Sequence, residues 1–200
     1  MNKKLQLLFF CSGISAIIYQ IVWQRVLFAS FGTDIESITI IVSVFMLGLG
    51  LGSLLGGAMS NASERKLINY FIGFETSIGL FGLISIPLIE YISELTFHLS
   101  AGWLPVIVFA ILMIPTFAMG ATLPVLVTYL FKQTKSVGSS VTRLYYINTL
   151  GSAIGCLLTV GVLFLFGTRQ TTIYFAAFLN FFIAISTYIG TRKKAHTHES

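Results

Sequence analysis

Long apolar segments separated by short charged ones dominate the pattern of this chain of 200 residues. Cutting the chain at its charged residues leaves six segments, and each can supply the roughly 20 apolar residues that a helix needs to cross a bilayer. The predicted helices cover approximately residues 5–31, 37–60, 67–89, 101–131, 143–166 and 171–191. Residues 192–200 form a polar tail, predicted to be cytoplasmic. The pattern therefore predicts an all-α integral membrane protein with six transmembrane helices and no soluble catalytic domain.

The second apolar segment contains a glycine-rich stretch, FMLGLGLGSLLGG at Phe45–Gly57. A dinucleotide-binding loop needs glycines at i, i+2 and i+5, but counting from Gly48 the third position is Ser53. No Gly-Lys-Ser/Thr sequence follows, so a phosphate loop is excluded as well. Gly48, Gly52 and Gly56 instead repeat every four residues and share one helical face. We expect these glycines to form a packing face between transmembrane helices.

Composition and charge support a membrane protein and exclude other classes. The chain is 56% hydrophobic and 10% charged, with a mean hydropathy of +0.89, far from the averages of soluble domains. A pI near 9.3 could indicate nucleic-acid binding, but the basic residues cluster at the ends of predicted helices, as membrane topology requires. No serine–histidine–acid set and no Cys/His metal spacing is visible. We therefore expect a lipid bilayer as partner, and no nucleic acid, cofactor, metal or catalytic residue.

The distribution of lysine and arginine predicts the orientation. One side of the predicted membrane carries most of the 12 basic residues: Lys3, Lys4, Arg65, Lys66, Lys132, Lys135, Arg143, Arg192, Lys193 and Lys194. The other side carries Arg25 and Arg169. The positive-inside rule then places both termini in the cytoplasm. At the outer end of the first helix, Arg25 is expected to reach the headgroups and Trp23 to lie at the lipid interface.

Glu75 is an acid inside the predicted helix 67–89. It follows Lys66 by about 13 Å along the helix, at 1.5 Å per residue. A carboxylate at that depth is costly and usually marks an ion, proton or substrate site. Its expected partners are Gln20, Asn180 or a bound cation. Alternatively, a protonated Glu75 only joins helices through hydrogen bonds, since burial favours the neutral carboxyl.

Small and polar residues follow one face of four predicted helices. These stripes are Ser12, Ala16, Gln20 and Gln24; Glu75, Gly79 and Gly82; Asn148, Ser152, Gly155 and Thr159; and Ala176, Asn180 and Ala184. One interpretation is that the stripes only pack against each other, as small residues do in membrane helices. The other is that some of them line a polar cavity. Asn148 then joins Glu75, Gln20 and Asn180 as a candidate ligand or ion contact.

A short internal repeat links the second and fifth helices. LGSLLGG at Leu51–Gly57 parallels LGSAIGC at Leu150–Cys156, 99 residues later. Gly52 and Gly56 of the first copy correspond to Gly151 and Gly155 of the second, which we expect to serve in helix packing too. Since the two helices run in opposite directions across the membrane, the halves would be inverted repeats of three helices, an architecture known from transporters.

Four segments occur in a characteristic order: SGISAIIYQIVWQRVLFASFG (Ser12–Gly32), VFMLGLGLGSLLGG (Val44–Gly57), PTFAMGATLPVL (Pro115–Leu126) and LYYINTLGSAIGCLLTVGVLFLFG (Leu144–Gly167). Together they resemble the amino-terminal membrane region of the membrane-bound spermidine synthase-like proteins, a bacterial family. In that family a multi-helix domain precedes a soluble polyamine aminopropyltransferase domain. The resemblance implies a location in the bacterial cytoplasmic (inner) membrane. Gln20 departs from the pattern, since many relatives are expected to carry an acid there.

The resemblance implies a function without catalysis by this chain. The glycine-rich loop and catalytic aspartate of the aminopropyltransferase domain have no counterpart before Ser200. The chain would therefore be a membrane module that anchors, or supplies, a soluble aminopropyltransferase-like partner. Residues Gly57–Lys66 also resemble the loop between helices two and three of the major facilitator superfamily, with Asn61 in place of its acid. The alternative is a half transporter of that kind, acting as a homodimer on cationic substrates.

Overall fold

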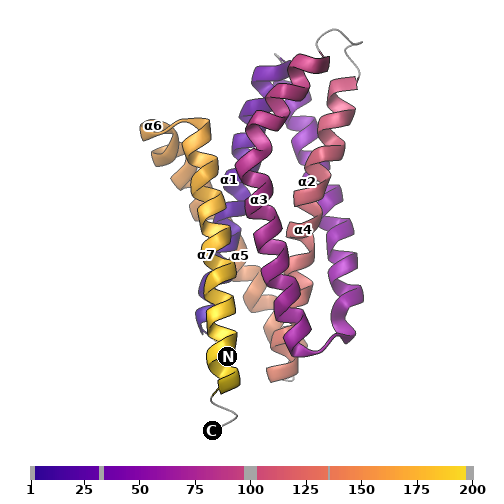
Figure 1. The fold of residues 1–200 in the computed structure, drawn as a ribbon, viewed down its shortest axis with the longest axis vertical. Coiled ribbons are helices and arrows are strands. Elements are labelled where there is room, and N and C mark those ends of the chain that lie inside the picture. The colour runs from indigo at the N-terminus through magenta and orange to yellow at the C-terminus, as the bar shows by residue number, and fades with distance from the viewer. Residues whose placement is uncertain (1–2, 32–33, 97–102, 135, 197–200) are drawn as a thin grey trace.

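The computed structural model describes residues 3–31, 34–96, 103–134 and 136–196 (Figure 1). These residues form helices joined by short connections, and none of them lies in a β-strand. Six spans in the described chain are long and apolar enough to cross a membrane. The amino- and carboxyl-terminal ends of the helical bundle lie at the same end of the molecule (Figure 1).

The helices extend beyond the uncharged segments. They are α1 (Lys3–Phe31), α2 (Asp34–Ala58), the 3₁₀ turn η1 (Met59–Asn61), α3 (Glu64–Thr96), α4 (Trp103–Thr134), α5 (Val137–Leu158), the π-helical turn η2 (Thr159–Leu163), α6 (Phe164–Phe166) and α7 (Arg169–His196). Helix α3, for example, continues past Glu90 and Glu94. Glutamate, lysine and arginine are good helix formers, so a charge marks where an apolar span ends but does not end the helix.

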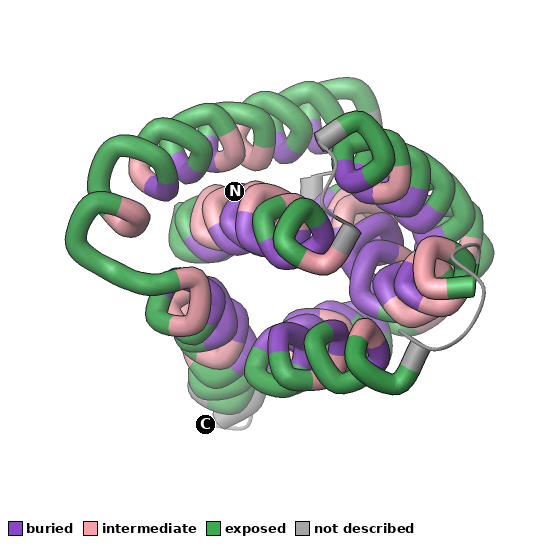
Figure 2. Tube along the Cα trace, turned by 90° about the horizontal axis from the view of Figure 1, so that it is seen from above, coloured by how far each residue is buried: buried purple, intermediate pink, exposed green. Residues whose placement is uncertain are grey.

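Helices of the amino-terminal half of the chain pack mainly against helices of the carboxyl-terminal half. α2 packs along α4 and α1 packs along α5, while α3 contacts both α4 and α7, and α1 also contacts α7. Buried residues gather on the inner faces of the helices and exposed residues on their outer faces (Figure 2). The span formed by α5, η2 and α6 (Gly138–Phe166) is the most peripheral one, with 17% of its apolar window buried inside the bundle. Its outer face therefore needs lipid or another chain to cover it.

Glycines set the close approach of α2 to α4. A Cβ at Gly48 would collide with Thr116, and one at Gly52 with the backbone carbonyl of Phe117. Gly56 lies equally close to the backbone of Ala121. The absence of a side chain at these positions is thus what allows the two backbones to touch.

Two apolar clusters lie one above the other along the bundle. The cluster nearer the termini includes Phe9, Phe71 and Val125, and the more distant one includes Ile18 and Ile78. Polar residues that are also buried occupy the helix positions between the clusters: Ser12, Ser15, Glu75, Thr122 and Asn180. The bundle is therefore apolar at both levels and polar at its centre.

Trp23 does not lie at a lipid interface. Its side chain is 0% exposed, stacks on Tyr19 at a centroid distance of 5.1 Å and donates a 3.0 Å hydrogen bond from Nε1 to Ser85 Oγ. The sequence prediction of an interfacial anchor is wrong here, because the partner that satisfies the indole N–H is a serine inside the bundle and not a headgroup. Arg25, two residues on, is exposed.

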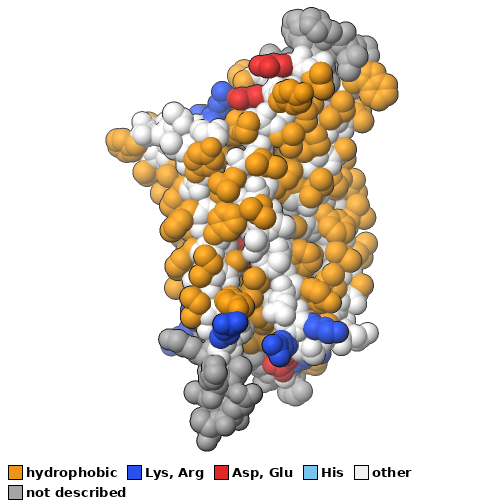
Figure 3. Space-filling model, viewed as in Figure 1, with side chains coloured by type: hydrophobic (Ala, Val, Ile, Leu, Met, Phe, Trp, Pro, Cys, Tyr) orange, Lys and Arg blue, Asp and Glu red, His pale blue; other side chains and the backbone are white. Residues whose placement is uncertain are grey.

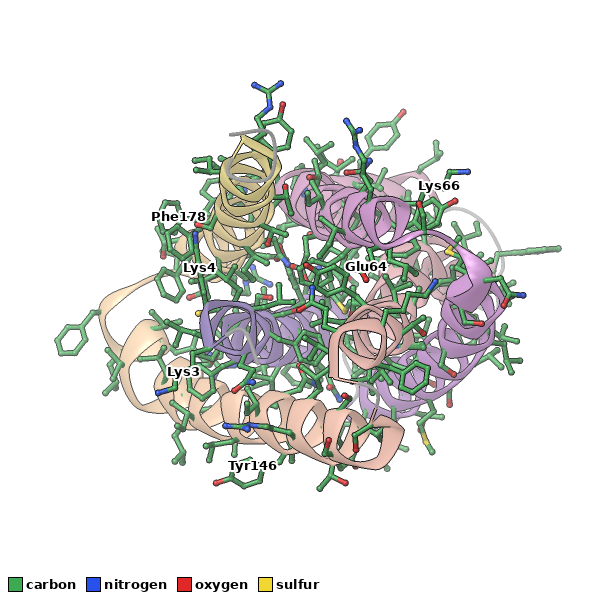
Figure 4. All side chains as sticks on the ribbon, turned by 90° about the horizontal axis from the view of Figure 1, so that it is seen from below. Lys3, Lys4, Glu64, Lys66, Tyr146 and Phe178 are labelled. Carbon is green, nitrogen blue, oxygen red and sulfur yellow. The ribbon has the colours of Figure 1, made fainter. Side chains whose placement is uncertain are left out.

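Charged residues gather at the two ends of the molecule, with an apolar band between them (Figure 3). Lysine and arginine predominate at the end that holds the termini, where Lys3, Lys4 and Lys66 lie on the ends of α1 and α3 (Figure 4). Lys135 and residues 197–200 of the predicted tail lie outside the described residues.

Candidate functional site

Glu75 sits at the centre of the polar layer and is 0% exposed. Ser12 Oγ on α1 donates a 2.7 Å hydrogen bond to Glu75 Oε1, and Asn180 Nδ2 on α7 donates one of 2.7 Å to Oε2. Gly79, one helical turn beyond Glu75, lets α7 approach, because a Cβ there would stand 3.3 Å from Asn180 Cβ. Three helices therefore meet at one carboxyl group, and each carboxyl oxygen has a donor.

A cavity of about 330 Å³ lies beside this cluster. That volume is within the usual range of small-molecule sites and far larger than the roughly 30 Å³ share of one water molecule. Ser12 and Asn180 belong to the wall of the cavity, whereas Glu75 stands behind them. The cavity is only partly enclosed, since its wall also includes the exposed residues Leu49, Ser53 and Tyr145.

The wall of the cavity is neutral and mixes hydrogen-bonding with apolar side chains. Its polar residues are Ser12, Ser15, Gln20, Ser53, Thr122, Tyr145, Asn148, Ser152 and Asn180, and its apolar part includes Phe9, Ile17, Phe45 and Met119. No charged side chain is among the described residues of the wall. The carboxyl of Glu75 lies behind this neutral wall, and its two hydrogen bonds connect it to the wall residues Ser12 and Asn180.

The structure separates the candidate residues into two roles. Asn180 bonds directly to Glu75, as one of the sequence predictions had it. Gln20 and Asn148 line the cavity, but among the described residues the hydrogen bonds to Glu75 come from Ser12 and Asn180. Gln20 lies two turns beyond Ser12 on α1, about 12 Å along the axis, which places it too far from the carboxyl.

Ser12 is the Glu75 partner that sequence reasoning did not single out. It opens the polar stripe of α1, and its Oγ reaches Glu75 near the level where Phe9 of α1 and Phe71 of α3 also meet, with ring centroids 6.4 Å apart. Serine within a membrane helix more often bonds to its own backbone, as Ser15 does to the Ser12 carbonyl at 2.9 Å. Only the pairing of α1 with α3 distinguishes the two serines.

The stripe on α5 holds that helix against α1. Ser152 Oγ donates a 3.1 Å hydrogen bond to the carbonyl of Gly13, and Gly151 and Gly155 leave no room for a Cβ next to the α1 backbone. Asn148 packs against Gly13 at the same interface and also lines the cavity. The packing and cavity interpretations of the stripes thus both apply, to neighbouring residues.

Within the described part of the chain, no group of three or more His, Cys, Asp or Glu side chains is arranged to hold a metal ion. The chain matches no protein-family model, no curated protein and no solved structure. The functional argument therefore starts from Glu75, its two donors and the cavity.

Proposed function

We propose that this chain is a membrane module that binds a small organic cation in the cavity beside Glu75, and that it supplies this ligand to, or anchors, a soluble aminopropyltransferase-like partner. The observation that carries the proposal is a carboxyl group with no solvent exposure that two cavity-wall residues connect to a cavity of about 330 Å³. A buried acid in an apolar bundle is costly and is generally kept for a ligand, ion or proton. A polyamine, the substrate class of the spermidine synthase-like proteins, is such a cation.

The resemblance to the spermidine synthase-like proteins and the cavity involve the same helices. The described parts of the four segments that carry the resemblance lie mainly on the four helices α1, α2, α4 and α5, and the last segment continues through η2 and α6. Those four helices contribute most of the cavity wall, while α3 and α7 contribute Ile78 and Asn180. The helices that resemble the spermidine synthase-like proteins are thus the ones that form most of the proposed ligand site.

An architecture of two inverted three-helix repeats, with α1–α3 as one and α4–α7 as the other, is part of the proposal. Gly52 of α2 lies against the backbone carbonyl of Phe117 on α4. In the same way, Gly151 of α5 lies against the backbone carbonyl of Phe10 on α1. The two glycines are 99 positions apart and the two phenylalanines 107 positions apart.

A second pair of contacts supports the repeat with the same spacing. Gly120 of α4 lies against the carbonyl of Leu49 on α2, and Gly13 of α1 lies against the carbonyl of Asn148 on α5. The α2 and α5 residues are again 99 positions apart, and the α1 and α4 residues again 107. Since chance similarity between apolar helices would not reproduce which backbone carbonyl each glycine meets, the agreement argues for a true internal repeat.

Two basic residues repeat the 107-residue spacing, although their partners, the Ala62 carbonyl and the Phe164 ring, are 102 positions apart. Lys132, near the end of α4, donates a 2.6 Å hydrogen bond to the carbonyl of Ala62, just after α2 and η1. Arg25, 107 positions earlier on α1, holds its guanidinium carbon 3.9 Å from the ring centroid of Phe164, just after α5 and η2. Each cation therefore covers the end of the second helix of the other half.

The proposed location is the bacterial cytoplasmic membrane, with both termini in the cytoplasm. The concentration of lysine and arginine at the end that holds the termini supports this orientation (Figure 3). At the opposite end, Glu90 pairs with Arg169 at 3.9 Å, an exposed ion pair that contributes little to stability.

Ligand binding tests the proposed function directly. The purified chain in phospholipid nanodiscs should bind radiolabelled putrescine, and Glu75→Gln should lower the affinity at least about tenfold, because it removes the negative charge that stabilises the cation through the cavity wall. Glu94→Gln, an exposed acid on the same helix, is the matched control and should bind as the parent does. Absence of binding by the parent protein, or equal binding by Glu75→Gln, would count against the proposal.

The second candidate function is a half transporter that works as a homodimer. It is favoured by one observation, the exposed residues Leu49, Ser53 and Tyr145 on the cavity wall, which a second copy could cover. Tyr145→Cys should then cross-link between copies in a Cys11→Ala, Cys156→Ala background. Tyr146→Cys should not, because Tyr146 points outward and does not belong to the cavity wall that the second copy would cover (Figure 4). Strictly monomeric protein that supports no putrescine flux in proteoliposomes would exclude this candidate.

A further inference from the structure

The direction of the two hydrogen bonds to Glu75 determines which donor and acceptor atoms of its partners remain for a ligand. Both of its protein donors are also residues of the cavity wall. Ser12 uses its hydroxyl hydrogen on Oε1, and Asn180 uses its amide nitrogen on Oε2. Ser12 therefore has only its hydroxyl lone pairs left for the cavity, and Asn180 keeps Oδ1 as an acceptor beside the second N–H of Nδ2.

Asn180 Oδ1 is a buried acceptor with no hydrogen-bond partner among the described residues. The short bond from Nδ2 to Glu75 fixes which end of the amide faces the carboxyl, so rotation of the amide cannot relieve Oδ1. Buried acceptors in native proteins almost always have a donor, and because Asn180 belongs to the cavity wall, a molecule in the cavity is one source of a donor for Oδ1.

From this arrangement we infer that Ser12 and Asn180 are the direct contacts of the ligand and that Glu75 is a positioning residue that makes both of them acceptors. The inference rests on the proposed function, which it deepens by naming the ligand chemistry. A primary alkylammonium group fits best, because it carries three N–H donors and a positive charge that the carboxylate behind the wall stabilises. The alkyl chain would lie along the apolar part of the wall, at Phe9, Ile17 and Phe45. A bare metal ion would leave that part unused.

Replacing Glu75 by glutamine inverts one of the two contacts. A glutamine carries an NH₂ group, and that group must donate to Ser12 or Asn180. The recipient then turns a hydrogen toward the cavity instead of a lone pair. The variant should therefore lose its preference for ligands that only donate hydrogen bonds over neutral ligands that also accept them. If Glu75 had only a structural role, its replacement would not change this preference.

Competition between two ligands of equal length tests this mechanism. The probes are putrescine, whose two ammonium groups only donate, and 1,4-butanediol, whose hydroxyls both donate and accept. Parent protein in nanodiscs should prefer putrescine by about 100-fold or more, since two charged hydrogen bonds separate the ligands. In Glu75→Gln this preference should fall by about tenfold or more, with diol binding unchanged or stronger.

Variants of the two contact residues complete the test. Ser12→Ala and Asn180→Leu should each weaken putrescine binding about tenfold or more, whereas Ser77→Ala and Asn69→Leu, at exposed positions of α3, should not. Thermal unfolding in detergent identifies any variant that fails to fold, and Ser12→Ala, which removes one oxygen, keeps the test valid if Asn180→Leu is such a variant. Failure of the parent to bind putrescine overturns both the function and the inference. Putrescine binding with an unaltered ligand preference in Glu75→Gln, or undiminished binding in Ser12→Ala, overturns the inference alone.

Discussion

Asn180 Nδ2 donates a 2.7 Å hydrogen bond to Glu75 Oε2 across 105 residues of the sequence. The bond joins α3 to α7, the third and sixth spans of the bundle. Because Asn180 also belongs to the cavity wall, the same bond holds two helices together and fixes the orientation of a side chain in the candidate site. Effects on folding and on binding must therefore be measured separately at this position.

Removing the amide of Asn180 should destabilise the bundle. Asn180→Ala leaves one oxygen of a buried carboxyl without its donor, which costs about 1–3 kcal/mol. Asn148→Ala, at a half-buried position on the same cavity, should cost less than about 1 kcal/mol. Reversible unfolding in mixed detergent micelles measures both values. Equal losses in the two variants would show that the Glu75 bond contributes nothing special to stability.

Two glycines on α2 should respond in opposite ways to the same substitution. Gly52→Ala places a Cβ against the carbonyl of Phe117 and should destabilise the protein by about 1–3 kcal/mol through overpacking. Gly50→Ala meets nothing within 4 Å and should be neutral or slightly stabilising, since alanine is the better helix former. Thermal unfolding in one detergent compares them. If Gly50→Ala proved as harmful as Gly52→Ala, the close contact of α2 with α4 would be wrong.

The two tryptophans should differ in the cost of losing their N–H group. Trp23→Phe removes the donor to Ser85 inside the core and should cost about 1 kcal/mol or more. Trp103→Phe, at a position 58% exposed, should change stability by less than about 0.5 kcal/mol. The unfolding free energies of the two variants check the prediction. A lipid-facing Trp23 would instead make the two losses similar.

Reporter fusions should reveal the orientation of the chain. A fluorescent protein that folds only in the cytoplasm should be active at either terminus, because lysine and arginine gather at that end of the bundle (Figure 3). Alkaline phosphatase, which is active only outside the cytoplasm, should work when fused after Glu94, near the opposite end of α3. Activity of the phosphatase at the carboxyl terminus would reverse the proposed topology.

Sequence alone was sufficient for the number and class of the helices. A helix that crosses a bilayer must make all its backbone hydrogen bonds internally and expose apolar side chains. It therefore needs a long segment without charges, and such a segment can be recognised from consecutive residues alone. The same local logic singled out Glu75 and the glycine face at Gly48, Gly52 and Gly56. None of it required knowledge of which helices are neighbours.

Only the tertiary structure shows which side chains of different helices contact each other. Sequence could propose Gln20 or Asn180 for Glu75, but which residues reach the carboxyl depends on how α1, α3 and α7 are set in height and rotation, and Ser12 took the place of Gln20. Trp23 likewise looked interfacial because its neighbour Arg25 is charged, whereas the rotation of α1 turns it toward Ser85. In an apolar chain most helix faces look alike, so close packing at a few glycines selects the neighbours, and only those neighbours assemble the cavity.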